Sequence, residues 1–374
     1  MPSDTDLRFM RACLMLARRH LGRTAPNPSV AALVAADDGN GPVIIGRGIT
    51  GDGGRPHAEH AALEQAGAAA RGATLYVGLE PCAQRSSQAH GPSCAERIIA
   101  AGIARVVIGA PDGSRYASNS GVAMLREAGI DVTESVAGDA ARALNLGHAL
   151  RISDGRPLVQ LKLAETADGF AGTLERKPIA ITGEEVRSFV HMMRAKADAI
   201  MVGVSTALAD DPLLNCRLPG MAAFSPVRVI VDSQLRCPLT LKLVTGARNI
   251  PTWVFAGVDA PAAREAALRQ QGVEVMRVGA GADGRLDLHQ ALRLLADRGI
   301  TRLMCEGGPA LASSLAAADL ADEVIVSRSK LVAAEGIPAL CGMLRGRLAD
   351  PALFARTDHR RAGDDEITTW VRQR

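Results

Sequence analysis

The stretch GRPHAEHAALEQAG, residues 54–67, places His57, Glu59 and His60 at the start of a predicted alanine-rich helix. Apolar runs typical of short strands, separated by further helical patterns, lie on both sides of it. The strands are predicted over 29–35, 41–49, 73–79 and 104–110, and the helices over 1–20, 93–102 and 120–129. This alternation predicts an α/β domain of three layers, in which helices cover both faces of one sheet.

A break in the pattern at Asp154-Gly155 and Pro157 precedes a second part of the chain. That part again alternates apolar strands with helices, which predicts another α/β domain. Its strands are predicted over 157–164, 199–204, 226–232, 251–257, 273–279, 302–308 and 322–328, and one of its helices over 183–197. We expect two domains, residues 1–149 and 150–374, because a chain of 374 residues exceeds the size of one ordinary hydrophobic core.

The composition argues against several classes of function. The net charge is +3 and aromatic residues make up 3% of the chain, whereas nucleic-acid-binding proteins usually combine a basic surface with aromatic stacking platforms. No apolar run is long enough to cross a membrane, and residues 1–20 are unlike a signal peptide. Seven cysteines, an odd number, indicate a reducing compartment. We expect a cytoplasmic protein that binds neither nucleic acid nor a membrane.

Candidate metal ligands follow from a count of donors. A catalytic zinc site usually has three protein ligands and leaves the fourth position for water. His57, Cys82 at a strand end and Cys94 at a helix start supply three such ligands. The dipole of that helix and the metal both favour the thiolate form of cysteine. The alternative, two unrelated buried thiols and a surface histidine, explains this order of residues less well.

Glu59 is free to carry protons if His57 binds the metal, because it need not be a ligand itself. It is the predicted general acid and base for a reaction in which water displaces an amine. His60 could reach the same ion as a fourth ligand, but it would then exclude water. We therefore interpret His60 as a partly exposed helix residue.

The second domain lacks the glycine pattern of a dinucleotide-binding Rossmann fold and that of a phosphate-binding P-loop. A strand runs through Gly307-Gly308 into a helix with Pro309 near its start, and free backbone amides at such a helix start suit a phosphate group. Many turns of this kind carry glycine for geometry alone. The sequence therefore leaves both interpretations open.

The combination of His-x-Glu with a later Pro-Cys and a further cysteine is typical of zinc-dependent nucleobase deaminases. Over nearly its full length the chain resembles the bifunctional riboflavin-biosynthesis deaminase/reductase family, called RibD. The matching blocks are TAPNPSVAALVA (24–35), PHAEHAALEQAG (56–67), ARGATLYVGLEPC (70–82), AAGIARVVIGA (100–110), LKLAETADG (161–169), HMMRAKADAIMVGVSTALADDPLLNCR (191–217), PVRVIVDSQLRCP (226–238) and CEGGPALAS (305–313).

The resemblance implies a cytidine-deaminase-like domain followed by a dihydrofolate-reductase-like domain. It implies zinc-dependent deamination of a diaminopyrimidinone ribotide and then NADPH-dependent reduction of its ribosyl group to ribityl, in a homo-oligomer formed through the reductase domains. The positions expected to contact NADPH are Ala164, Thr206, Asp210, Ser233, Gly308, Pro309, Ala310, Leu311, Ala312, Ser313 and Ser314. The positions expected to contact the substrate are Asn27, Lys162, Arg194, Leu214, Arg217 and Glu306.

Residue chemistry is consistent with some of these roles. Arg194 and Arg217 carry forked cations that suit a phosphate group, although an arginine on a helix is more often simply solvated. Lys162 and Asp210 are candidates for moving the protons of the sugar during hydride transfer. Asp210 also fits a plain Asp-Asp-Pro turn.

The chain departs from the family pattern at three places. The loop between the two cysteine ligands, which includes His90, is longer than usual, and the segment 111–121 lacks the usual Asp-Pro-Asn-Pro. Pro178 and Ala180 replace a serine and a tryptophan ahead of the helix at 183–197. The last of these differences keeps one rival hypothesis open, a single-function deaminase that acts on another base and has a decayed second domain. A deaminase acting on tRNA and a zinc-stabilised scaffold without activity are further rivals.

Overall fold

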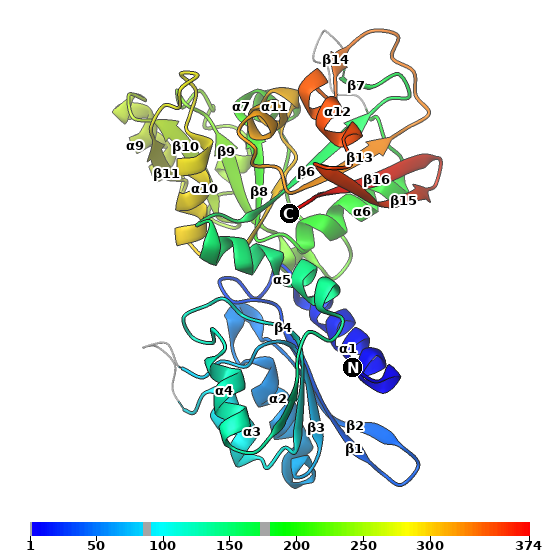
Figure 1. Cartoon of the computed structure of the whole chain (residues 1–374). Coiled ribbons are helices and arrows are strands. Elements are labelled where there is room, and N and C mark those ends of the chain that lie inside the picture. The colour runs from blue at the N-terminus through cyan, green and yellow to red at the C-terminus, as the bar shows by residue number, and fades with distance from the viewer. Residues whose placement is uncertain (1, 85–90, 173–179) are drawn as a thin grey trace. The chain divides into compact units, whose positions relative to one another are not determined.

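The computed structural model describes residues 2–84, 91–172 and 180–374 (Figure 1). It forms two compact units, Met1–Gly155 and Arg156–Arg374. The division lies at the Asp154-Gly155 break and not after residue 149, because helix α5 (Gly138–Ser153) continues through that position. In the described parts of the chain, no helix combines the length and the apolar character that crossing a bilayer requires.

The first unit contains a five-stranded sheet in the order β2-β1-β3-β4-β5. Strand β1 is antiparallel to β2 and β3, whereas β3, β4 and β5 are parallel. The strands are β1 (Ala31–Asp37), β2 (Pro42–Ile49), β3 (Thr74–Leu79), β4 (Arg105–Ala110) and β5 (Asp131–Thr133). Helices α1 (Asp4–Ala17) and α5 pack on one face, and α2 (Ala58–Ala66), α3 (Cys94–Ala100) and α4 (Ser120–Glu127) lie on the other. The predicted three-layer arrangement is confirmed.

Helix α2 lies unusually close to strand β2 because two positions of the strand lack a side chain. A Cβ atom at Gly48 would lie 2.0 Å from the carbonyl oxygen of Ala58, and one at Gly46 would lie 2.2 Å from that of Ala62. Any larger residue would push the helix away from the sheet. These glycines therefore set the position of the helix that begins directly after His57.

The second unit contains a nine-stranded sheet in the order β11-β10-β9-β8-β12-β6-β13-β16-β15. The strands from β11 to β13 in this order are parallel, and β16 and β15 form an antiparallel hairpin at one edge. The strands are β6 (Leu158–Glu165), β8 (Ala199–Gly203), β9 (Val227–Val231), β10 (Thr252–Gly257), β11 (Glu274–Val278), β12 (Arg302–Cys305), β13 (Glu323–Arg328), β15 (Phe354–Ala362) and β16 (Asp365–Arg372). Strands β7 (Phe170–Gly172) and β14 (Ile337–Pro338) pair separately.

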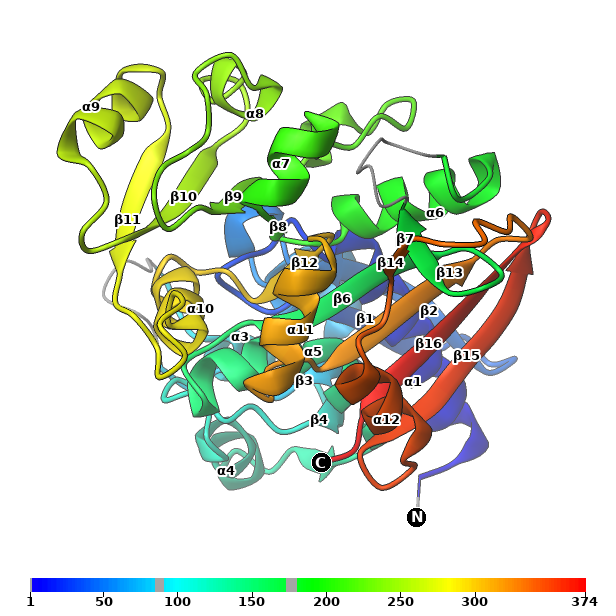
Figure 2. The same ribbon diagram turned by 90° about the horizontal axis from the view of Figure 1, so that it is seen from above.

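Helices cover both faces of this sheet, because alternate strand residues point to opposite sides. On β8, Met201 belongs to the apolar core beneath α10 (Leu288–Asp297) and α11 (Pro309–Ala317), whereas Ile200 belongs to the core beneath α7 (Val204–Asp210) and α8 (Lys242–Thr245). Figure 2 shows these two pairs of helices on opposite sides of the strands. The remaining helices are α6 (Glu184–Ala195), α9 (Ala262–Gln270) and α12 (Gly342–Ala349).

Candidate active sites

The three predicted metal ligands of the first unit come together in the fold. His57 is the N-cap of α2, Cys82 follows the end of β3, and Cys94 is the first residue of α3. Nδ1 of His57 lies 3.3 Å from Sγ of Cys94 and 3.8 Å from Sγ of Cys82, and all three ligand atoms lie within 4.8 Å of one another. His60 is not part of this cluster of described residues.

The donor set fits zinc in both chemistry and spacing. In a tetrahedral site with Zn–S of about 2.3 Å and Zn–N of about 2.0 Å, neighbouring ligand atoms are roughly 3.6 Å apart. The two distances from His57 bracket this value. Cys94 lowers the pKa of Cys82, although burial opposes it, so one thiol of the pair already favours the thiolate form that a metal requires.

Glu59 lies beside this cluster, in the first turn of α2, with 4% of its surface exposed. Burial raises the pKa of Glu59, while the charge of His57 opposes this effect. The carboxyl group also lies within hydrogen-bonding reach of Cys94. A carboxyl group with a raised pKa next to a metal site is a candidate for taking up and releasing a proton.

Asn27 is held at the loop that leads to His57. Its Nδ2 donates to the carbonyl oxygen of Gly54 at 3.0 Å. Gly54 has a φ of +91°, and a Cβ atom there would lie 2.1 Å from Nδ2 of Asn27. The asparagine side chain is therefore fixed by a backbone conformation that favours glycine.

In the second unit, Lys162, Arg194 and Glu306 form a cluster. Nε and Nη2 of Arg194 donate to the two carboxylate oxygens of Glu306 at 2.7 and 2.8 Å, and both side chains are nearly buried, 12% and 11% exposed. Burial acts to raise the pKa of Glu306, but this pairing holds it below its ordinary value. Burial lowers the pKa of Lys162, and the nearby negative charge of Glu306 opposes this.

The pairing changes the interpretation of Arg194 as a free fork for the phosphate group. Its remaining donor, Nη1, binds the carbonyl oxygen of Asn215 at 3.1 Å. The exposed Arg217 is tied to the same residue, because its Nη1 donates to Oδ1 of Asn215 at 2.8 Å. Leu214, which precedes Asn215 in the chain, is buried and has a φ of +49°. Arg217 is thus the more accessible of the two predicted cations.

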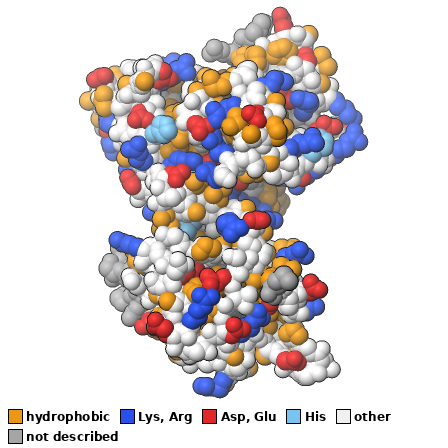
Figure 3. All heavy atoms as spheres, in the orientation of Figure 1, with side chains coloured by type: hydrophobic (Ala, Val, Ile, Leu, Met, Phe, Trp, Pro, Cys, Tyr) orange, Lys and Arg blue, Asp and Glu red, His pale blue; other side chains and the backbone are white. Residues whose placement is uncertain are grey.

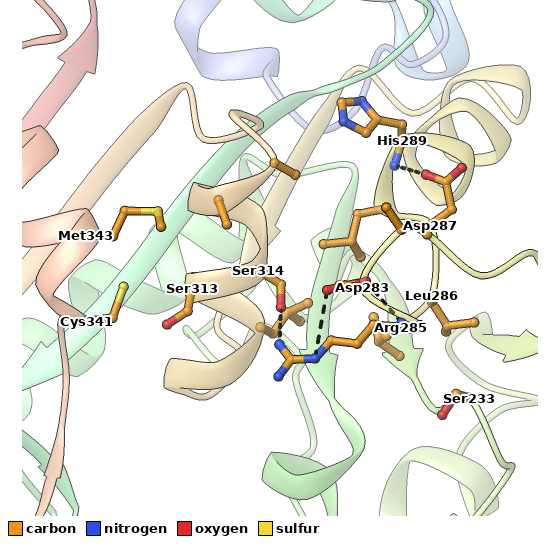
Figure 4. Close-up of a pocket in the computed structure, with 18 of the residues that line it drawn as sticks. Ser233, Asp283, Arg285, Leu286, Asp287, His289, Ser313, Ser314, Cys341 and Met343 are labelled. Atoms are coloured by element: carbon orange, nitrogen blue, oxygen red, sulfur yellow. Dashed lines mark hydrogen bonds and ion pairs between the residues drawn. The ribbon is translucent and has the colours of Figure 1, made fainter.

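A cavity of about 840 Å³ lies in the second unit beside α11 (Figure 4). Of the predicted cofactor positions, four line it: Ser233, Leu311, Ser313 and Ser314. The other predicted positions, all described, are outside this lining: Ala164, Thr206, Asp210, Gly308, Pro309, Ala310 and Ala312. Among these, Oγ1 of Thr206 accepts a hydrogen bond from the backbone N–H of Gly308 at 2.9 Å, which fixes the turn ahead of α11.

Sequence comparison decides the family. The chain is 36% identical over 334 residues to riboflavin biosynthesis protein RibD of Aquifex aeolicus, with 89% of each chain covered. It is 34% identical over 381 residues to RibD of Haemophilus influenzae, with 99% of this chain and 98% of the relative covered. This chain belongs to the RibD family. Within it, residues 3–110 match the zinc-binding region of cytidine and deoxycytidylate deaminases and residues 157–333 match the RibD C-terminal domain.

Solved RibD structures have the same fold. RibD of Acinetobacter baumannii superposes with a TM-score of 0.85 at 30% identity and covers 99% of both chains. The deaminase/reductase of Thermotoga maritima superposes with a TM-score of 0.83 at 31% identity and covers 98% of this chain and 99% of that one. The predicted fold class is confirmed.

Family membership establishes an enzyme of riboflavin biosynthesis with a deaminase and a reductase activity. Its cofactors are zinc for the first domain, where the His57, Cys82 and Cys94 cluster lies, and NADPH for the RibD reductase domain. Because the match extends over both halves, the hypothesis of a deaminase with a decayed second domain has no support. On the face shown in Figure 3, basic and acidic side chains are interspersed over most of the surface, which suits a small-molecule substrate.

Residues that the sequence pattern did not reveal also shape both sites of this RibD protein. In the first unit, Glu80 is buried and accepts hydrogen bonds from backbone N–H groups ahead of and within α4. In the second unit, Asn215 links Arg194 to Arg217, and Arg285 lines the cavity. Each acts through tertiary contacts that carry no local sequence signal. Two positions noted in the sequence, His90 and Pro178, lie outside the described residues, and Ala180 is exposed.

Proposed function

We propose that the first domain removes an exocyclic amine from a diaminopyrimidinone ribotide and that the second reduces the ribosyl group of the product. The Thermotoga maritima protein is named a diaminohydroxyphosphoribosylaminopyrimidine deaminase and 5-amino-6-(5-phosphoribosylamino)uracil reductase, which supports this choice of substrate. The observation that carries the proposal is the convergence of His57, Cys82 and Cys94 beside the buried carboxyl group of Glu59.

Glu59 is the proposed proton carrier of the deaminase. A zinc ion bound to one imidazole and two thiolates supplies a Lewis acid that makes water a better nucleophile. The carboxylate of Glu59 takes the proton from the attacking water and later delivers it to the nitrogen of the departing amine. Burial raises the pKa of this carboxyl group and so assists the first transfer, in which the carboxylate takes up the proton. Asn27, fixed against Gly54, is the proposed contact of the pyrimidine.

Lys162 is the proposed proton donor of the reductase. Bound NADPH would supply a hydride for C1′ of the ribose, and the bond from C1′ to the ring oxygen would break. The ring oxygen must then gain a proton, and the ammonium group of Lys162 can give one up more readily because burial lowers its pKa. Glu306 and Arg194 hold the charge around this lysine fixed, and the exposed Arg217 is the proposed phosphate contact. Asp210, exposed at the end of α7, stays a predicted contact of NADPH.

One experiment separates the two activities. Purified zinc-loaded protein is given the diaminopyrimidinone ribotide and NADPH, and ammonia release and NADPH oxidation are followed in the same tube. Glu59→Gln should abolish both signals but leave NADPH oxidation intact when the deaminated ribotide is supplied instead. Lys162→Met should stop NADPH oxidation and leave ammonia release unchanged.

Two surface variants serve as controls. Glu64→Gln, on the exposed side of the same helix as Glu59, and Lys330→Met, an exposed lysine of the second unit, should change neither signal. Metal analysis of Glu59→Gln should show the zinc content of the unaltered protein. Ammonia release by Glu59→Gln at the normal rate contradicts the assignment of Glu59. Ammonia release without NADPH oxidation by the unaltered protein contradicts the reductase half of the proposal.

Assembly and cell compartment belong to the same proposal. All seven cysteines are free thiols, which supports a reducing, cytoplasmic location. The predicted homo-oligomer through the reductase domains rests on family resemblance, and light scattering on the purified protein tests it. A mass equal to that of one 39.0 kDa chain contradicts the oligomer.

A further inference from the structure

A tight hairpin forms one wall of the cavity in the second unit. Its strands meet at a bridge between Ala280 and Leu286, and the backbone N–H of Gly281 donates to the carbonyl oxygen of Arg285 at 2.7 Å. Gly284, with a φ of +73°, closes the turn through a hydrogen bond from its N–H to the carbonyl oxygen of Gly281 at 3.0 Å. The backbone of Arg285 is therefore fixed relative to the cavity.

The side chain of Arg285 reaches across the cavity to α11 (Figure 4). Its Nη1 donates to Oγ of Ser314 at 3.0 Å, while Oγ of Ser314 itself donates to the carbonyl oxygen of Ala310. Nε lies 4.0 Å from a carboxylate oxygen of Asp283, a loose and exposed pair. The side chain is 67% exposed, so the guanidinium group is accessible to a ligand.

The order of the strands in the sheet indicates how a dinucleotide lies in the cavity. Nicotinamide must approach the substrate cluster around Lys162 on β6, whereas the hairpin follows β11, an edge strand that lies five positions from β6 in the sheet. Ligands of such sheets lie across the carboxyl ends of the strands. The adenosine half of a dinucleotide therefore extends toward the hairpin.

The position of Arg285 along α11 matches a particular atom of that adenosine. A phosphate group placed at the start of α11 would lie about 7.5 Å from the level of Ser314, because a helix rises about 1.5 Å per residue. The ribose lies between the 5′-linked phosphates and its own 2′ substituent. A nucleotide with its diphosphate at the helix start thus brings the 2′ position next to the guanidinium group.

We propose that Arg285 determines cofactor specificity by pairing with the 2′-phosphate of NADPH, so that the reductase discriminates against NADH. Among the described residues that line the cavity, Arg285 is the only arginine or lysine. A guanidinium fork binds a phosphate group through two parallel hydrogen bonds, which a ribose hydroxyl group cannot replace. The inference rests on the proposed reductase function, which it extends to the choice of cofactor.

The neighbouring carboxylate of Asp283 has a different role from that of Arg285. A free carboxylate near the 2′ position would instead accept a hydrogen bond from the hydroxyl group of NADH. Here one oxygen of Asp283 accepts the backbone N–H of Arg285 at 3.0 Å, and the other lies toward Nε of Arg285. The carboxylate therefore shapes the turn and orients the arginine.

Binding of two nucleotide fragments tests the proposal without catalysis. Calorimetry on the full chain compares adenosine 2′,5′-bisphosphate with adenosine 5′-monophosphate. Arg285→Gln should weaken the bisphosphate by about tenfold or more, as expected for the loss of charge-assisted hydrogen bonds, and leave the monophosphate unchanged. Arg293→Gln, an exposed arginine on α10 outside the cavity lining, is the matched control and should change neither.

Steady-state kinetics give the second measurement. Arg285→Gln should raise the KM for NADPH by a similar factor with kcat unchanged and leave the KM for NADH unaltered, whereas Asp283→Asn should retain the preference for NADPH. Equal weakening of both fragments, or of neither, overturns the proposal. So does an enzyme that prefers NADH and loses this preference in Asp283→Asn. If the unaltered enzyme oxidises neither cofactor in the presence of the deaminated ribotide, the reductase function itself fails.

Discussion

The most quantitative prediction from the structure concerns the buried side chain of Glu80. Helix α4 begins at Ser120 without a side-chain hydrogen bond from its own N-cap, Asn119. Glu80, buried at 4% exposure just after β3, supplies the missing acceptors. Its two carboxylate oxygens accept the backbone N–H groups of Asp112, Asn119, Gly121 and Val122 at 3.4, 3.2, 3.2 and 3.4 Å. The carboxylate also faces the positive end of the helix dipole.

The expected cost of Glu80→Ala follows from these contacts. A hydrogen bond to a charged group contributes about 1.5–3 kcal/mol at good geometry, but these four are long and share one carboxylate, so their contributions do not add fully. Together with the dipole, we expect a loss of about 2–3 kcal/mol in the free energy of unfolding of the first unit. With an m value of about 2 kcal/mol per molar urea, the midpoint falls by about 1–1.5 M.

The chain offers a separate optical probe for each unit. Both tyrosines, Tyr76 and Tyr116, lie in the first unit, and both tryptophans, Trp253 and Trp370, lie in the second. Urea unfolding is therefore followed by tyrosine second-derivative absorbance and by tryptophan fluorescence on the same sample. Glu80→Ala should shift the tyrosine transition and leave the tryptophan transition in place.

A matched variant guards against nonspecific effects of removing a carboxylate. Glu64→Ala, on the exposed side of α2, should leave both transitions unchanged. If Glu80→Ala moves the tyrosine midpoint no further than Glu64→Ala does, the hydrogen bonds of Glu80 contribute little and the reasoning is refuted. Reduced zinc content in Glu80→Ala is expected as well, because Glu80 stands two residues before Cys82.

Three further outcomes are expected. Glu306→Gln leaves its nearly buried arginine partner without a counter-charge and should cost the second unit about 3 kcal/mol, seen as a shift of the tryptophan transition alone. Gly54→Ala puts a Cβ atom 2.1 Å from Nδ2 of Asn27, in a backbone conformation that costs a non-glycine residue roughly 1–2 kcal/mol. It should raise the KM of the deaminase by about tenfold at constant zinc content, and an unchanged KM contradicts this prediction. Arg105 holds the pKa of Asp6 well below its usual range, so the unfolded chain binds more protons there than the folded one. That stabilisation is complete above about pH 5 and is lost as the pH falls, so Asp6→Asn should flatten the decline of the urea midpoint between about pH 5 and pH 3.

Local sequence patterns predicted the elements that carry the metal site. The helix after His57 lies in an alanine-rich stretch and the strand before Cys82 in an apolar run, and the ligands lie at their ends. The hairpin of β15 and β16 was not predicted, because FARTDHRRA and DEITTWVR have little apolar alternation. It forms because β16 pairs with β13, and its charged residues suit the exposed edge of a sheet. Helix α5 was not among the predicted helices either.

The partners of charged groups could not be predicted from spacing. Arg194 has the chemistry of a phosphate ligand, but the fold places Glu306, distant in sequence, against both arms of its fork. Glu80 reads as part of the strand before a cysteine ligand, and its role depends on the start of α4 coming to the same place. Sequence patterns specify residue types along one segment, whereas these roles arise where two segments meet.

The two buried glutamates show why burial alone does not assign a chemical role. Burial acts to raise the pKa of both Glu59 and Glu306. At Glu306 the paired guanidinium of Arg194 reverses the effect, so this carboxylate stays ionised and can orient charge but has no proton to give. At Glu59 burial prevails, and the carboxyl group can exchange a proton. Proton transfer in the second domain must then come from another group, which is why Lys162, whose pKa burial lowers, is the stronger candidate there.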